Sequence, residues 1–146
     1  MLRDYTNFLD CVATDLQGPF LLSWWMNCYN IPFVDYSSYL PDCMAVPAKS
    51  NMADALQWYI RTYGKMRVLR MDGGGEMIGT DEFSGVMSIC TALEIKVVVT
   101  VPGEHELVAE VFNRISGNMG RSAMICQGAP ARSWDYARKY QFQVYV

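Results

Sequence analysis

Two short strand-like runs separated by a helical pattern constrain the fold of this chain most. Residues 66–71 are largely apolar, and residues 95–101 (IKVVVTV) are β-branched almost throughout. Between them, apolar residues recur at helical spacing, which predicts a helix over residues 82–93. Strand, helix and strand at this spacing predict a βαβ unit with two parallel strands and a right-handed crossover. The 95–101 run has the composition of a strand that is buried on both faces.

The first part of the chain predicts an antiparallel meander. Apolar or β-rich segments alternate there with turn-rich stretches, and the three predicted strands cover about residues 10–16, 24–31 and 39–46. Pro41 cannot donate a ladder hydrogen bond, so we place the third strand at an edge of the sheet.

Three further helices complete the predicted fold. The clearest spans residues 52–63, where apolar side chains form one stripe and Gly64 supplies the stop. Two others are predicted at about residues 104–116 and 131–141, and the first has an apolar stripe formed by Leu107, Val108, Val111, Phe112 and Ile115. The fold class is therefore α/β, a mixed sheet of three antiparallel strands followed by two parallel ones, flanked by helices. We expect one domain over residues 1–146.

Composition excludes several classes of protein. Of the 146 residues, 51% are hydrophobic and 18% are charged, with a net charge of −3, unlike a disordered tail or a protein that coats nucleic acid by bulk charge. No apolar run approaches the roughly 20 residues of a membrane span, and the start lacks a secretory pattern. We expect an intracellular protein, nuclear or cytoplasmic, without membrane contact. The five cysteines are too widely spaced for a disulfide framework or a zinc knuckle.

Three acids lie where such a fold presents side chains to a ligand. Asp15 ends the first strand, Asp72 ends the first parallel strand, and Glu110 follows the second parallel strand on a helix. Converging carboxylates repel one another, so a cluster of them is stable mainly around a divalent cation such as Mg²⁺ or Mn²⁺. Each acid also has a structural interpretation: Asp15 and Asp72 as turn residues, and Glu110 as the i, i+4 partner of Arg114. The residues alone leave both interpretations open.

Six motifs occur in order over about residues 12–137: VATDLQGPF, IPFVDYSSY, VPAKSNMADALQWYI, VLRMDGGGEM, TVP followed by LVAEVFNR, and SWDYA. In this order they resemble the catalytic core of integrases from copia-type long-terminal-repeat retrotransposons, which has a ribonuclease H-like fold. The most specific match is VLRMDGGGEM, close to the family's Leu-Arg-x-Asp-Asn-Gly-Gly-Glu. The resemblance implies that Asp15, Asp72 and Glu110 form the family's Asp-Asp-Glu triad. The 37 residues between Asp72 and Glu110 are close to the family's spacing.

The resemblance also implies an activity, cofactors and partners. It implies DNA integration by divalent-metal-dependent phosphoryl transfer, the work of a polynucleotidyl transferase or nuclease. Asp15 would bridge two Mg²⁺ or Mn²⁺ ions, with Asp72 and Glu110 each completing one side. DNA would be the partner, and a homodimer is a further option.

The sequence also departs from the family's pattern. Gly73 replaces the family's Asn after the second aspartate. In the loop before the helix that carries Glu110, Glu104 and Glu106 add negative charge, which disfavours binding of DNA phosphates. These departures favour the alternative, a catalytically inactive, retroelement-derived or domesticated domain that acts as a binding or assembly module. We interpret His105 as a solvated loop residue. We interpret the four tryptophans as core rather than as a base-stacking surface: Trp24, Trp25, Trp58 and Trp134.

Overall fold

The computed structural model describes residues 5–71, 81–100 and 107–144. The strands are β1 (Cys11–Thr14), β2 (Tyr29–Asp35), β3 (Pro41–Val46), β4 (Val68–Met71) and β5 (Lys96–Val99). The helices are α1 (Met52–Tyr63), α2 (Asp81–Ala92), α3 (Leu107–Gln127) and α4 (Trp134–Val144). Two short 3₁₀ turns, η2 (Lys49–Asn51) and η3 (Ala131–Ser133), precede α1 and α4.

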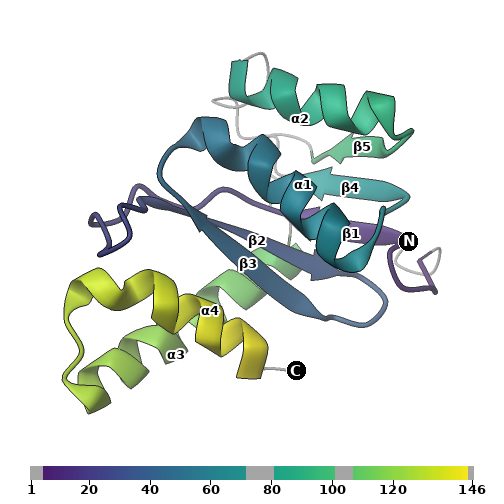
Figure 1. Ribbon diagram of the computed structural model, residues 1–146. Coiled ribbons are helices and arrows are strands. Elements are labelled where there is room, and N and C mark those ends of the chain that lie inside the picture. The colour runs from purple at the N-terminus through teal and green to yellow at the C-terminus, as the bar shows by residue number, and fades with distance from the viewer. Residues whose placement is uncertain (1–4, 72–80, 101–106, 145–146) are drawn as a thin grey trace.

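The five strands form one mixed sheet in the order β3-β2-β1-β4-β5 (Figure 1). The first three strands pair antiparallel as a meander, and β4 pairs parallel with both β1 and β5. This arrangement confirms the predicted mixed sheet. The prediction that Pro41 belongs to an edge strand is also confirmed, because it begins β3 at one end of the sheet.

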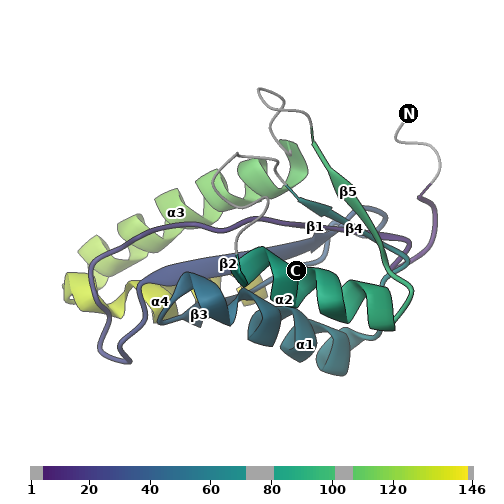
Figure 2. The ribbon, with the colours of Figure 1, turned by 90° about the horizontal axis from the view of Figure 1, so that it is seen from above.

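One face of the sheet is covered by α1 and α2, which lie side by side (Figure 2). The predicted stripe of α1 is buried there, and Gly64 ends the helix at φ 112°, a conformation that favours glycine. Phe33 of β2 stacks on Tyr59 of α1 with ring centroids 4.6 Å apart. Apolar burial between these two helices and the sheet forms the larger core.

The opposite face is covered by α3 and α4, where Phe112 and Phe142 pack against Val34 and Cys43. The helix α3 continues to residue 127 rather than ending near residue 116 as predicted. Two glycines inside it lower its intrinsic helix propensity, but both are buried where α4 packs closely, so tertiary contact outweighs propensity. No described helix, α3 included, is long and apolar enough to cross a membrane.

The second strand lies later in the chain than predicted, at residues 29–35 rather than 24–31. The Ser23 hydroxyl accepts hydrogen bonds from the backbone N–H groups of Trp25 and Asn27 at 3.2 and 3.1 Å, and Met26 has φ 64°. This local turn competes with an extended strand. Trp24 and Trp25 are consequently 58% and 64% exposed, so their prediction as core residues is wrong.

For the other two tryptophans and the last strand, the predicted burial is partly confirmed. Trp134 is buried, as predicted, and Trp58 is half-buried. The strand β5 was predicted to be buried on both faces, but Lys96 is exposed and the three valines after it are only half-buried. The reason is its place at the edge of the sheet, where β4 is its one partner among the described strands.

Candidate active site

Asp15 follows directly after β1, the central strand of the sheet. All four residues of β1 are buried, and Asp15 itself is half-buried. Its Oδ1 accepts a hydrogen bond from the backbone N–H of Leu16 at 2.8 Å, as a turn residue would. Its Oδ2 accepts a second hydrogen bond, at 3.1 Å, from Nδ2 of Asn113 on α3. Asp15 therefore joins the sheet to a helix that lies far away in the sequence, in addition to shaping its own turn.

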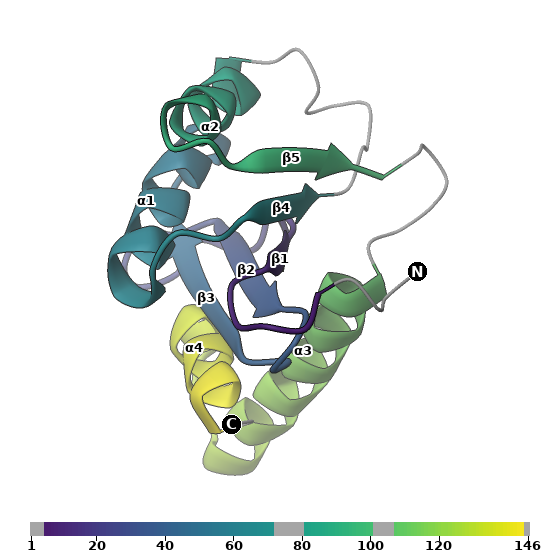
Figure 3. The same ribbon diagram turned by 90° about the vertical axis from the view of Figure 1, so that its right-hand side faces the viewer.

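The parallel strands β1, β4 and β5 have their C-terminal ends side by side, and Asp15 directly follows β1 at that end of the sheet. Thr14, the last residue of β1, pairs with Met71, the last residue of β4, and Met71 pairs with Val99 of β5. Directly after β5, Thr100 donates its backbone N–H to the carbonyl of Met71 at 3.0 Å. Figure 3 shows the arrowheads of β4 and β5 pointing to the side on which α3 begins. The carboxyl ends of parallel strands are where α/β sheets usually bind their ligands.

Several predictions from the sequence concern positions outside the described residues, namely Asp72, Gly73, Glu104, His105 and Glu106. The membership of Asp72 in a carboxylate triad therefore stays a prediction.

The helix α3 carries the third predicted acid. Val108 packs against the cluster that contains Ala13 and Val68, which holds the first turns of α3 against β1 and β4. Glu110 lies in the first turn and is exposed, as is Arg114 one turn later. Within the described part of the chain no ion pair joins Glu110 to Arg114, so the surface-pair interpretation of Glu110 is wrong.

Asn113 of α3 was not predicted as a site residue, but its side chain contacts Asp15. Asn113 is 5% exposed, and besides the Nδ2 bond to Asp15 it has a buried Oδ1 with no partner among the described residues. A buried amide oxygen of this kind usually marks a place that water or an ion completes. The available signal was its spacing, because Asn113 follows Glu110 by three residues and so lies beside it on the helix.

The apolar stripe predicted for α3 also needs one correction. It included Val111, whose side chain is 39% exposed, whereas the polar Asn113 is buried. The helix face that carries Asn113 turns toward Asp15, so a polar pair replaces an apolar contact at this point.

The chemistry of the described donors suits a hard divalent cation. Asp15 and Glu110 offer carboxylate oxygens and Asn113 an amide oxygen, the ligand types that Mg²⁺ and Mn²⁺ prefer. Among the described residues no group of three or more His, Cys, Asp or Glu side chains is placed to hold a metal ion. Two of the three predicted carboxylates, Asp15 and Glu110, are described, and Asn113 links Asp15 to α3, the helix that bears Glu110.

No protein-family model and no curated protein sequence matches the chain. Solved structures of integrases do match it. The integrase catalytic core domain of HTLV-2 in complex with magnesium, in its dimeric form, superposes with a TM-score of 0.65 at 17% identity, over 91% of this chain and 85% of that chain. Its trimeric form gives a TM-score of 0.63 at 17% identity, over 89% and 82%. The chain has the fold of an integrase catalytic core.

A third match comes from a larger assembly with the integrase-core fold. It is the intasome of simian T-cell lymphotropic virus in complex with the PP2A regulatory subunit B56 gamma, with a TM-score of 0.71 at 14% identity over 93% of this chain. This chain covers 49% of that one. The matches confirm the ribonuclease H-like α/β sheet that the motifs implied. A likeness at such low identity establishes the fold, and function has to be argued from the site.

Proposed function

We propose that this integrase-core-like domain catalyses divalent-metal-dependent phosphoryl transfer on DNA, the chemistry of DNA integration. The observation that carries the proposal is the hydrogen bond between Asn113 and Asp15. It connects the end of the central strand to the first turns of the helix that bears Glu110. Asp72 is the proposed third carboxylate, because the residue before it, Met71, pairs with the residue before Asp15.

We propose that the three carboxylates together hold two Mg²⁺ or Mn²⁺ ions. When bound at such a site, paired ions activate the attacking oxygen and stabilise the leaving oxygen of an in-line displacement. Asn113 fixes one oxygen of Asp15 and so orients the carboxylate. Glu110 is exposed, which leaves the site open to a polymer. Arg114 is exposed one turn further along, and we assign it to a phosphate contact with DNA. The magnesium complexes of the HTLV-2 core support this choice of ion.

Two finer proposals accompany this one. The order of the six motifs supports descent from a copia-type retrotransposon. The dimeric and trimeric forms of the HTLV-2 core support self-association of this chain, which sedimentation measurements can test.

The proposal is tested by incubating the full chain with supercoiled plasmid DNA and Mg²⁺, Mn²⁺ or EDTA. We expect nicking with Mg²⁺ or Mn²⁺ and none with EDTA. A Mn²⁺ titration followed by electron paramagnetic resonance provides an independent measure of binding. A folded chain that binds no Mn²⁺ and cuts no DNA would instead support the inactive binding module.

The positioning role of Asn113 gives a graded prediction. Asn113→Ala should lower metal affinity and nicking about 10–100-fold, the usual effect of losing a group that orients a metal ligand. The matched control is Asn118→Ala on the same helix, since Asn118 is exposed and its side chain accepts a hydrogen bond from Arg121 instead of contacting Asp15. Mn²⁺ affinity and nicking rate are measured for both variants. Equal losses in the two variants would mean that the substitution acts through the helix and not through Asp15.

A further inference from the structure

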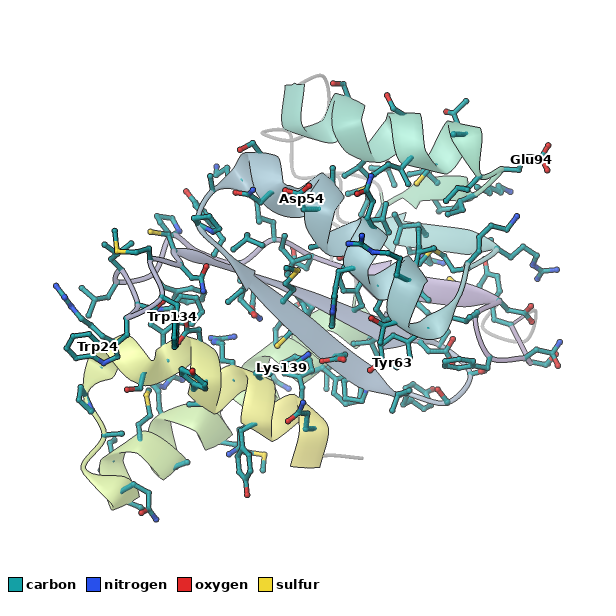
Figure 4. The ribbon with its side chains drawn as sticks, viewed as in Figure 1. Trp24, Asp54, Tyr63, Glu94, Trp134 and Lys139 are labelled. Carbon is teal, nitrogen blue, oxygen red and sulfur yellow. The ribbon has the colours of Figure 1, made fainter. Side chains whose placement is uncertain are left out.

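A cavity of about 200 Å³ lies between α3, α4 and the segment that leads to the Ser23 turn. Trp134 and Phe20 form part of its lining, with ring centroids 4.7 Å apart. The indole N–H of Trp134 donates to the carbonyl of Leu21 at 2.6 Å, which fixes this wall. Figure 4 shows Trp134 at the start of α4, beside the loop that carries Trp24. The lining contains none of the proposed catalytic acids.

The cavity remains open because α3 presents glycines to it. A Cβ atom at Gly117 would lie 3.1 Å from a guanidinium nitrogen of Arg138, and one at Gly120 would touch the backbone of Ala137. The lack of a side chain at Gly117 therefore leaves room for the Arg138 guanidinium, whereas a Cβ atom at Gly120 would make ordinary van der Waals contact with Ala137.

Arg138 gives the cavity a positive charge. Its Nη1 donates to Oε1 of Gln17 at 2.7 Å, and its guanidinium lies 4.7 Å from the ring centroid of Phe20. Within the described residues no carboxylate forms an ion pair with it. A guanidinium has five N–H donors, and among the described residues the hydrogen bond to Gln17 uses one of them.

A second cation lines the same cavity. Arg121 of α3 is exposed, and its guanidinium donates to the side-chain oxygen of Asn118. Burial lowers the pKa of Arg138, and the positive charge of Arg121 lowers it further, against an opposing effect of Cys43. Two like charges beside one apolar cavity are stabilised by an anion between them.

The geometry points to a binding site for a small amphipathic oxyanion, a carboxylate or phosphate monoester attached to an apolar group about the size of one ring. Arg138 and Arg121 would bind the oxyanion through charge-assisted hydrogen bonds, which guanidinium groups form in pairs with such oxygens. Trp134, Phe20 and Met124 would contact the apolar group. The volume suits this size, because a protein cavity of roughly 150 Å³ accommodates benzene.

The site is tested by calorimetric titration of the full chain with benzoate and with phenyl phosphate. Two comparison compounds separate the contributions of the probe's parts: inorganic phosphate is an oxyanion without an apolar group, and benzyl alcohol has the ring without the charge. We expect one intact probe to bind at least tenfold more tightly than either comparison compound, and the preference between the two probes distinguishes a carboxylate from a phosphate ligand. The NMR signal of the Trp134 indole N–H should shift on binding, because this group lies in the cavity wall.

Two variants and one control assign the binding to the arginines. Arg138→Gln should weaken binding of the preferred probe at least tenfold, and Arg121→Gln, on an exposed side chain, should weaken it several-fold without affecting folding. The control is Arg132→Gln, because Arg132 is exposed and lies over the Trp24 ring instead of the cavity. Benzyl alcohol binding as tightly as benzoate, or unchanged affinity in both cavity variants, would overturn the proposal. Displacement of the probe by duplex DNA would assign the site to the DNA backbone and would overturn it as well.

Discussion

Replacing Asp15 by Asn is expected to reduce metal-dependent DNA nicking by on the order of 100-fold or more. Partners that only orient a metal ligand change affinity or activity about 10–100-fold, so loss of a proposed ligand should cost at least as much. The substitution keeps one acceptor oxygen for the backbone N–H of Leu16, which contacts Asp15 at 2.8 Å, and its new NH2 group can donate to Oδ1 of Asn113 once the Asn113 amide flips. The free energy of unfolding should therefore change little, and the loss should appear in catalysis and Mn²⁺ binding.

Glu110→Gln and its control complete this test. Glu110→Gln should have an effect of similar size to Asp15→Asn, since both acids are proposed metal ligands. Glu94→Gln should have none, because Glu94 precedes β5 and so lies at the opposite end of the parallel strands (Figure 4). Nicking rates and Mn²⁺ binding are compared at equal protein concentration. Full nicking by Asp15→Asn would contradict the proposed site even if the wild-type chain cuts DNA.

The periodicity of apolar residues was sufficient to predict most helices and strands, because burial of one face of an element imposes that spacing on its sequence. The helix over residues 52–63 agrees with α1 at both ends, since its apolar stripe and Gly64 are local signals. The parallel pairing of β4 and β5 followed from their spacing, because a connection of this length carries a helix across the sheet. Edge position could not be predicted for β5, because pairing partners are a property of the assembled sheet.

Where prediction failed, a nonlocal contact or a side-chain hydrogen bond outweighed the pattern. The Ser23 hydroxyl forms a turn where an apolar run predicted a strand. The close approach of α4 stabilises α3 beyond Gly117, although the apolar spacing predicted an end near residue 116. Asn113 shows the same limit at the site, because only the folded structure reveals that its amide reaches Asp15.

The side chain of Asp35, the last residue of β2, holds two segments of the chain together by hydrogen bonds. Asp35 is fully buried, and its Oδ2 accepts from the backbone N–H groups and hydroxyls of Ser37 and Ser38 at 2.8–3.1 Å. Its Oδ1 accepts from the N–H of Leu9 at 2.8 Å, which joins the segment before β1 to the β2–β3 turn. One carboxylate thus satisfies five donors from two separate segments.

Asp35→Ala should therefore lower the free energy of unfolding by about 3–5 kcal/mol, because hydrogen bonds to a charged acceptor are lost and their donors lose their partner. Asp35→Asn keeps an acceptor oxygen and should cost less. The control is Asp54→Ala, an exposed acid on α1, which should change stability by less than about 1 kcal/mol. Urea unfolding followed by tryptophan fluorescence measures all three, and an unchanged dependence on urea would place the effect in the native state. Equal stability of Asp35→Ala and Asp54→Ala would contradict this prediction, because it would mean that the Asp35 carboxylate adds nothing to the free energy of unfolding.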